Sequence, residues 1–234
     1  MKPTIKMIED LSLNAWPSHQ IQLYDGWLLR FSYFYTHRTN CVEQIGPSSI
    51  PIEEKINFCE DAYHRWGTPS IFKITPLLPD DFEKRLIDRR YAVQHVTEVM
   101  TLDLAPWQIT MPPVSVRLER TINDRWIQSL FALKSTKDTL AASITNSDGQ
   151  IVAIGLGILD RSYMGIYAIH VHPHYRGRQY ARSVCTSLLN RGKELGMTGA
   201  YLQVVEGNTP AKRLYLSLGF EDFYSYRFRV KELF

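Results

Sequence analysis

Residues 166–189 read IYAIHVHPHYRGRQYARSVCTSLL, and three patterns follow one another in this stretch. Alternating apolar side chains up to Val171 predict a strand, and apolar side chains at helical spacing from Ala181 onward predict a helix. A basic loop with one glycine joins the two. Because the start of a helix offers several free amides and a partial positive charge, this order of strand, loop and helix predicts an anion site.

The loop contains the groups that a phosphate ligand would need. Five consecutive backbone amides would surround the phosphate, those of Gly177, Arg178, Gln179, Tyr180 and Ala181. Gly177 permits a left-handed backbone, and the guanidinium groups of Arg176 and Arg178 add charge and forked donors. An ordinary strand-to-helix turn with solvated arginines is the alternative, and the loop alone does not decide between the two.

The composition is that of an ordinary globular protein. Apolar residues make up 44% of the 234 residues and charged residues 22%, which predicts a buried core in one large domain or two smaller ones. A net charge of +3 is too small to indicate a nucleic-acid partner. The three cysteines lack CxxC spacing, which argues against a disulfide framework and a zinc knuckle. Without a signal-peptide or membrane-spanning pattern, the sequence predicts a cytoplasmic protein with no membrane partner.

A proline-rich stretch divides the chain into two halves. The segment LAPWQITMPP predicts a linker at residues 106–113, between a first half, residues 1–105, and a second half, residues 114–234. In the second half, strands are predicted over residues 114–119, 139–145, 150–160, 162–171, 199–205 and 223–230, and helices over residues 124–134, 181–195 and 208–218. Asp124 is the predicted cap of the first of these helices. This order predicts an α/β fold with a mixed sheet and helices packed on it.

The first half follows a similar order with weaker patterns. Strands are predicted over residues 26–34, 38–45, 70–75 and 97–104, and helices over residues 52–66 and 80–90. Both halves end with a Lys-Arg-Leu helix, an aromatic residue and a closing strand, which predicts an internal duplication. The corresponding loop of the first half, GPSSIP at residues 46–51, has no arginine and two prolines without an N–H. Only the second half is therefore predicted to bind phosphates.

The stretches VHPHYRGRQYA and LQVVEGNTPAKRLYLSLGF together resemble the GNAT superfamily of acyl-CoA-dependent N-acetyltransferases. The phosphate motif of that family is Q/R-x-x-G-x-G/A, and its later signature is an Asn before a helix that carries Leu-Tyr and ends in Gly-Phe. Arg176 and Ala181 match the ends of the first motif, and Asn208 and Tyr215 match the second. The first half resembles the amino-terminal half of tandem-GNAT proteins, in a degenerate form without the phosphate loop. One departure is Gln179, which replaces the central glycine of the motif.

The resemblance implies two tandem GNAT-like domains, of which residues 114–234 are catalytic. It implies transfer of an acetyl group from acetyl-CoA to a primary amine of a small or peptide acceptor by direct attack on the thioester, without a metal. The backbone of Ile169, His170 and Val171, facing Gln203 and Val204, would bind the thioester and pantetheine. Asn208 would complete the coenzyme site. A homodimer is left open.

Proton transfer is assigned to two residues, each with a plainer alternative. The resemblance makes Tyr215 the general acid, although its place in an apolar stripe also fits core packing, and Asn208 also fits a plain helix cap. His170 is a candidate general base because of its titration range, and Glu206 is a candidate because it follows the opposite strand. Both also fit ordinary residues at the end of a strand. A metal is not predicted at His170, His172 and His174, because Pro173 interrupts the strand between them. A non-catalytic acyl-CoA-binding or regulatory module is the alternative function.

Overall fold

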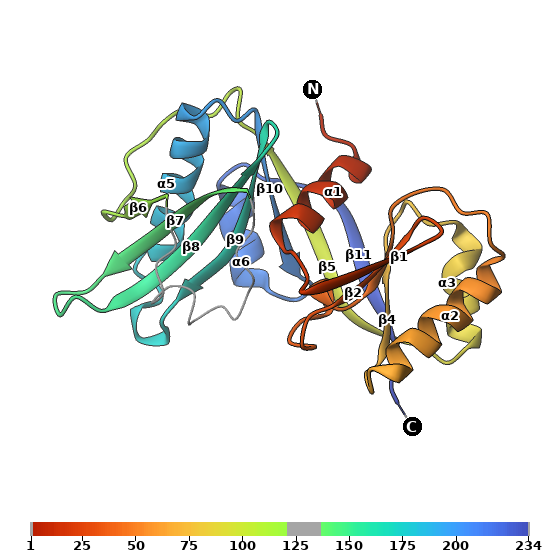
Figure 1. Ribbon diagram of the computed structural model, residues 1–234. Coiled ribbons are helices and arrows are strands. Elements are labelled where there is room, and N and C mark those ends of the chain that lie inside the picture. Colours follow the sequence, from red (N-terminus) through yellow and green to blue (C-terminus); the bar gives the residue numbers. More distant parts are fainter. Residues whose placement is uncertain (1, 121–136, 234) are drawn as a thin grey trace. The chain divides into compact units, whose positions relative to one another are not determined.

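The computed structural model describes residues 2–120 and 137–233, so the helix predicted over residues 124–134, with its cap Asp124, lies outside the described residues. The contacts of the chain divide it into two compact units, and each unit combines two separate stretches of sequence (Figure 1). Unit 1 consists of Met1–Ala15 and Glu98–Phe223, and unit 2 consists of Trp16–Thr97 and Tyr224–Phe234. No helix among the described residues is long and apolar enough to cross a membrane.

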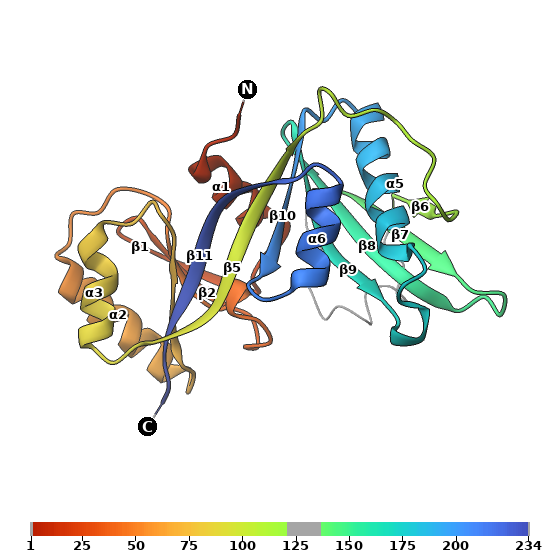
Figure 2. The same cartoon turned by 180° about the vertical axis from the view of Figure 1, so that it is seen from behind.

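Unit 1 is a mixed sheet with helices on both faces. Its complete elements are α1 (Ile5–Ala15), β6 (Arg117–Glu119), β7 (Asp138–Thr145), β8 (Ile151–Asp160), β9 (Tyr163–Val171), α5 (Tyr180–Glu194), β10 (Gly199–Val205) and α6 (Thr209–Ser217). Parts of β5 (Ala92–Asp103) and β11 (Glu221–Lys231) complete the strand order β11-β5-β10-β9-β8-β7-β6. Strands β6 to β9 pair antiparallel, and β9 and β10 pair parallel. Helices α5 and α6 cover one face, and α1 lies on the other (Figures 1 and 2).

The core of unit 1 lies between the sheet and α5. Val184, Cys185 and Leu188 of α5 are fully buried in one apolar cluster with residues of β7 to β10. Gly155 on β8 permits this close packing, since a Cβ at that position would lie 2.3 Å from Cγ1 of Val184. Burial raises the pKa of the Cys185 thiol to about 12. Cys185 is therefore a neutral packing residue at physiological pH.

Unit 2 contains a second mixed sheet. Its complete elements are β1 (Gln20–Tyr24), β2 (Trp27–Phe31), the 3-10 turn η1 (His37–Thr39), β3 (Val42–Gln44), α2 (Ile52–Arg65), β4 (Ser70–Ile74) and α3 (Asp80–Asp88). With parts of β11 and β5, the strand order is β1-β2-β3-β4-β11-β5. Strands β3 and β4 pair parallel, whereas β1 with β2, β2 with β3 and β4 with β11 pair antiparallel. Helices α2 and α3 pack their apolar residues on one face of this sheet.

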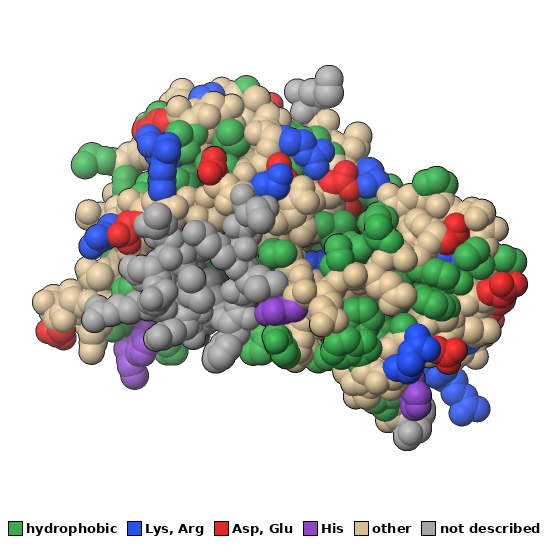
Figure 3. Space-filling model, viewed as in Figure 1, with side chains coloured by type: hydrophobic (Ala, Val, Ile, Leu, Met, Phe, Trp, Pro, Cys, Tyr) green, Lys and Arg blue, Asp and Glu red, His purple; other side chains and the backbone are tan. Residues whose placement is uncertain are grey.

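The aromatic residues of β2 and its following loop have different environments. Trp27 and Phe31 are buried in the core of unit 2, and Phe34 packs against that core. Tyr33 and Tyr35 are instead 84% and 71% exposed. Apolar side chains are also visible on the surface over β1 and β2 (Figure 3). Packing in the core of unit 2 therefore accounts for Trp27 and Phe31 and not for the two tyrosines.

Two strands contribute to both units. Strand β5 passes from unit 2 to unit 1 between Thr97 and Glu98, and β11 passes from unit 1 to unit 2 between Phe223 and Tyr224. Within unit 2, β11 pairs with β4 from Arg227↔Ile74 to Lys231↔Ser70. Ion pairs of Glu83 on α3 with Arg227 and Arg229 support this pairing, and the distance to Arg229 is 2.8 Å. The last strand of the chain thus completes the sheet built by the first part of the sequence.

The predicted elements correspond closely to the observed ones in the second half. The structure confirms the hairpin turn at residues 146–149, where the Gly149 amide donates to the Asn146 carbonyl over 3.1 Å. It also confirms the ends of both described helices at Gly196 and Gly219, which have φ angles of 81° and 87°. The segment of residues 104–116 forms no helix or strand, and Trp107 Nε1 donates to Asn190 of α5 over 3.1 Å. The linker between two duplicated halves at residues 106–113 stays a prediction.

Two elements of the first half were not predicted. For helix α1, the sequence pattern that could have predicted it is the helical spacing of three apolar residues, Ile8, Leu11 and Ala15, whose side chains are buried. Strand β1 is followed by Asp25-Gly26, a dipeptide typical of a two-residue hairpin. Both signals are short, and the side chains of β1 are mostly exposed, so hydrophobic alternation marks that strand weakly.

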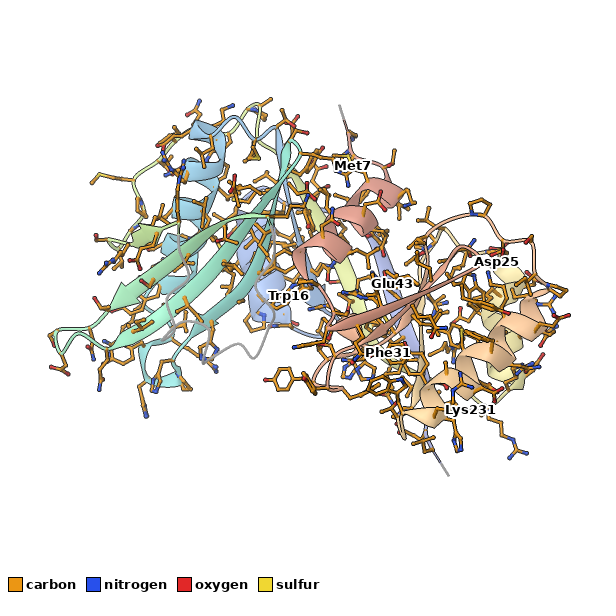
Figure 4. All side chains as sticks on the ribbon, in the orientation of Figure 1. Met7, Trp16, Asp25, Phe31, Glu43 and Lys231 are labelled. Atoms are coloured by element: carbon orange, nitrogen blue, oxygen red, sulfur yellow. The ribbon has the colours of Figure 1, made fainter. Side chains whose placement is uncertain are left out.

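A buried group of charges lies on the sheet of unit 2. Glu43 of β3 contacts Arg30 of β2 at 3.0 Å and Lys73 of β4 at 3.4 Å, and all three side chains are buried (Figure 4). Burial opposes ionisation of Glu43, but Lys73 and Arg30 lower the pKa of its carboxyl. Lys73 also lies 4.4 Å from the centre of the Tyr226 ring on β11. These contacts tie β2, β3, β4 and β11 together.

Replacing Glu43 by Gln tests this interpretation. Glu43→Gln preserves the shape of the side chain but leaves two buried cations without their carboxylate, so the free energy of unfolding should fall by about 3–5 kcal/mol. Urea unfolding of both proteins measures the difference. Glu194→Gln, which removes an exposed i,i+3 pair with Arg191, is the control and should change the value by less than about 0.5 kcal/mol. An equally small effect of Glu43→Gln would contradict a structural role of the charge group.

Candidate functional site

Strands β9 and β10 separate at the middle of the sheet of unit 1. Their parallel pairing runs from Tyr163↔Gly199 to Ile166↔Leu202 and then ends, although β9 continues to Val171 and β10 to Val205. Ala168 follows this point with a φ of 52°, and the pairing of β9 with β8 changes register opposite it. Such an irregularity bends a strand away from its neighbour. Among the described residues, the backbone of residues 169–171, predicted to bind the thioester, therefore has an unpaired edge towards β10.

The loop after β9 leads directly to the start of α5. A 3-10 turn, η2 (Pro173–Tyr175), comes first, and Gln179 occupies the position before the first helical residue. Within the described residues, the amides of residues 177–181 donate no hydrogen bond. Arg176 and Arg178 form no ion pair with any described residue and are exposed. The structure thus brings the predicted amides and both arginines together at one helix start.

Tyr175 keeps this loop in place. Its hydroxyl accepts a hydrogen bond from Nδ2 of Asn146 over 3.0 Å, and its ring stacks on that of Tyr180 at 6.2 Å. The Arg178 guanidinium lies 5.3 Å from the centre of the same ring. Arg176 Nε also donates to the Val171 carbonyl over 3.3 Å. These contacts order the loop around Tyr175, which was not predicted to have a role. The spacing of the two aromatic residues Tyr175 and Tyr180 is the feature of the sequence that could have indicated it.

Gln179, at the position of the motif's central glycine, has a backbone conformation that favours glycine. Its φ and ψ are 64° and 10°, in the left-handed region, which costs a non-glycine residue about 1–2 kcal/mol. Gly177, two residues earlier, also has a positive φ of 75°. The departure at Gln179 therefore places a side chain in a conformation that glycine adopts without strain, and the cost lies in the backbone of one residue.

Tyr215 and Asn208 lie on α6, which follows β10. Asn208 is the helix cap, because its side chain accepts from the Ala211 amide over 3.4 Å, as the plainer interpretation predicts. Tyr215 is 8% exposed and packs against Phe220, with 6.1 Å between ring centres. Burial raises the pKa of Tyr215, so its hydroxyl stays protonated at neutral pH. This hydroxyl bonds to no other described residue and is not fully shielded, which leaves it able to donate to a ligand.

Comparisons with known proteins agree on one family. The family model described as "Probable histone acetyltransferase Rv0428c C-terminal" matches residues 3–229. The chain belongs to this GNAT family. It is 23% identical over 245 residues to "Uncharacterized N-acetyltransferase YobR" of Bacillus subtilis (strain 168), with 97% of this chain and 98% of that protein aligned.

Two solved GNAT structures share the fold along almost the whole chain. A GCN5-related N-acetyltransferase from Kribbella flavida superimposes with a TM-score of 0.74 at 12% identity, over 99% of this chain and 96% of that one. A tandem GNAT protein from the clavulanic acid biosynthesis pathway gives 0.64 at 12% identity, over 99% and 90%. The predicted GNAT-like fold and the assignment as an N-acetyltransferase are thereby confirmed.

His170 and Glu206, the two candidate general bases of this GNAT protein, lie beside the point where β9 and β10 separate. His170 is exposed between Ile169 and Val171, which pack against the core beneath α5. Since neighbouring residues of a strand point to opposite faces, the His170 side chain points away from α5. Glu206 is exposed just after β10. The rings of His172 and His174 are 5.4 Å apart, and no group of three potential ligands for a metal ion occurs among the described residues.

Replacing Gln179 by Gly should relax the loop of the GNAT protein. Because glycine adopts a positive φ at no steric cost, Gln179→Gly should raise the free energy of unfolding by about 1 kcal/mol and tighten coenzyme A binding. Thermal unfolding and calorimetry measure the two effects. Gly177→Ala is the matched control: its Cβ would meet no atom within 4 Å, so it adds only backbone strain at a φ of 75° and should destabilise. Weaker coenzyme binding by Gln179→Gly would instead mean that the glutamine side chain holds a phosphate.

Proposed function

We propose that the protein transfers the acetyl group of acetyl-CoA to a primary amine of a small or peptide acceptor, with residues 114–234 as the catalytic part. The observation that carries the proposal is the row of amides at residues 177–181, which have no partner in the described part of the chain and lie next to the open edge of β9. These two features suit two adjoining parts of coenzyme A, the diphosphate and the extended pantetheine arm. Bound acetyl-CoA would supply an activated thioester.

The head of α5 supports binding of the diphosphate. Its free amides donate to phosphate oxygens, and the partial positive charge of the helix start favours an anion. Arg176 and Arg178 add positive charge at the same place, and neither forms an ion pair with any described residue. Asn208 at the head of α6 is proposed to contact the coenzyme while it caps that helix.

The separated strands support binding of the pantetheine arm. An extended ligand can pair with an exposed strand edge as an added strand does. The backbone from Ile169 to Val171 offers such an edge, opposite Gln203 and Val204 of β10. A backbone N–H at this edge would donate to the thioester carbonyl as negative charge develops on its oxygen during attack by the amine.

Proton transfer is assigned to Tyr215 and His170. The protonated hydroxyl of Tyr215 would donate to the sulfur as the C–S bond breaks, and the amine would lose its proton to His170, directly or through water. The two side chains belong to opposite faces of the sheet, because α6 and α5 cover one face and His170 points away from it. Acid and base are thereby kept apart.

Binding is tested by removing both loop cations together. The variant Arg176→Gln/Arg178→Gln should bind coenzyme A at least about tenfold more weakly, because two charged donors to phosphate are lost. Calorimetry at two salt concentrations measures the affinity, and the salt dependence should be smaller in the variant. Arg191→Gln, at the other end of α5, is the control and should bind like the wild type. An unchanged affinity of the double variant would remove the phosphate assignment of this loop.

Turnover is tested at Tyr215. Tyr215→Phe retains the ring and removes the hydroxyl, so turnover should fall by roughly 100-fold while coenzyme A affinity stays within about twofold. Thiol release from acetyl-CoA across a panel of amines measures turnover, and calorimetry measures affinity. Phe220→Leu changes the packing partner of Tyr215 and leaves its hydroxyl, so it separates packing from acid catalysis. Equal loss of turnover and affinity in Tyr215→Phe would assign the residue to packing.

A non-catalytic acyl-CoA-binding or regulatory module is the second candidate. The exposed position of both base candidates and the strained Gln179 favour it. The same amine panel distinguishes the two functions. A module of this kind would bind coenzyme A without releasing thiol for any amine.

A further inference from the structure

The strand-to-helix turn of the first half already has an anion in front of its helix. Strand β3 leads through residues 45–51 to α2, and Asp25 extends its carboxylate into this turn from the hairpin between β1 and β2 (Figure 4). The Ser49 amide donates to Oδ1 and Oδ2 of Asp25 over 3.0 and 2.9 Å, and the Ile50 amide donates to Oδ2 over 2.8 Å. The Ser49 hydroxyl donates to Oδ1 over 2.9 Å.

A buried cation completes this arrangement. Lys55, one turn into α2, has a side chain that is 1% exposed, and its Nζ lies 3.3 Å from Oδ2 of Asp25. The same Nζ donates to the Asp25 carbonyl and to the Ser48 hydroxyl, and it lies 4.2 Å from the centre of the Trp27 ring. The hydrogen bond from the Ile50 amide, together with those from Ser49 and Lys55, lowers the pKa of Asp25 to about 2, although burial of the carboxyl acts in the opposite direction. The carboxylate is therefore charged throughout the physiological range.

The two halves place their amides at equivalent positions. Ser49 and Ile50 immediately precede Pro51, the residue before α2, as Gly177 and Arg178 immediately precede Gln179, the residue before α5. The amides of Ser49 and Ile50 are bonded to Asp25. The amides of Gly177 and Arg178 have no partner among the described residues. The sequence suggested that the prolines of GPSSIP leave too few donors. The structure shows that two donors are present and already occupied.

We propose that Asp25 takes the place of a coenzyme phosphate in the first half, closes that half to acyl-CoA and so limits the chain to one coenzyme site. The proposal rests on the proposed function, which assigns the equivalent amides of the second half to the coenzyme. A phosphate and the Asp25 carboxylate would compete for the same two amides, and the repulsion of two anions excludes joint occupancy.

The hairpin cannot easily withdraw the carboxylate. Asp25 and Gly26 form a tight turn with φ angles of 42° and 77°, and a Cβ on Gly26 would lie 2.1 Å from the Pro47 carbonyl oxygen. The amides of Ile45 and Gly46 both donate to the Gly26 carbonyl, over 2.9 and 3.0 Å. The turn and the loop ahead of α2 are thus joined on both sides of Asp25, which holds the carboxylate at the helix start.

The test removes the carboxylate and supplies a free anion. Asp25→Gly retains a residue that accepts the positive φ and deletes the side chain, and Asp25→Asn retains a neutral acceptor oxygen as the control. The full-length proteins, labelled with ¹⁵N, are titrated with sodium formate and with inorganic phosphate at constant ionic strength. The amide signals of Ser49 and Ile50 in Asp25→Gly should move and saturate at millimolar anion, and its melting temperature should recover towards that of the wild type. These signals should stay fixed in the wild type and move much less in Asp25→Asn.

The opposite results would overturn the proposal. If Ser49 and Ile50 of Asp25→Gly ignored both anions, the carboxylate would not be a substitute for phosphate. The wild type offers a second measurement that does not depend on the folding of a variant: coenzyme A should bind once per chain and move the signals of Gly177 and Arg178 but not those of Ser49 and Ile50. Two bound molecules, or movement at Ser49 and Ile50, would contradict closure. Absence of any coenzyme binding would refute the proposed function, while the formate titration would still decide the role of Asp25.

Discussion

Backbone amides at the start of a helix have no partner within that helix, and the organisation of both halves follows from how these amides are satisfied. In the first half the chain supplies its own acceptor, since Asp25 bonds to Ser49 and Ile50. In the second half the corresponding amides have no partner among the described residues, and Tyr175 keeps the loop in shape without using them. The same strand-to-helix connection thus becomes a structural joint in one half and a candidate binding site in the other.

The second constraint is the sharing of strands between the units. In unit 1, β5 lies between β10 and β11 in the strand order, so a strand from the first half of the sequence stands next to the strand that borders the separation from β9. Helix α1, from the beginning of the chain, also belongs to this unit, and its Ser12 accepts from Gln203 of β10 over 2.8 Å. Residues 114–234 carry the motifs of the family, but the sheet around the candidate site also needs residues 5–15 and 98–103.

What could be predicted from the sequence was local. The hairpin at residues 146–149, the cap Asn208 and the basic loop before α5 each depend on neighbours within a few residues, and the structure places all three as their patterns indicate. The positive φ of Ala168 has no glycine to signal it, because the bulge arises from pairing with β8. The contact of Asp25 with Ser49 joins residues 24 positions apart, and the pairing of β11 with β4 joins the end of the chain to its first half. Such contacts are set by packing between distant segments, which no local pattern encodes.

The positions of Tyr215 and His170 give the proposed reaction a direction. Tyr215 belongs to the apolar cluster beneath α5 and α6, where burial raises its pKa and keeps the proton on its oxygen. The hydroxyl therefore carries a proton at neutral pH that it can donate to the sulfur as the C–S bond breaks. His170 is exposed on the other face, where an amine can arrive with its proton and solvent can carry that proton away. The break in pairing of β9 with β10 after Ile166 lies between these two faces, so the proposed chemistry depends on it as well as on the two side chains.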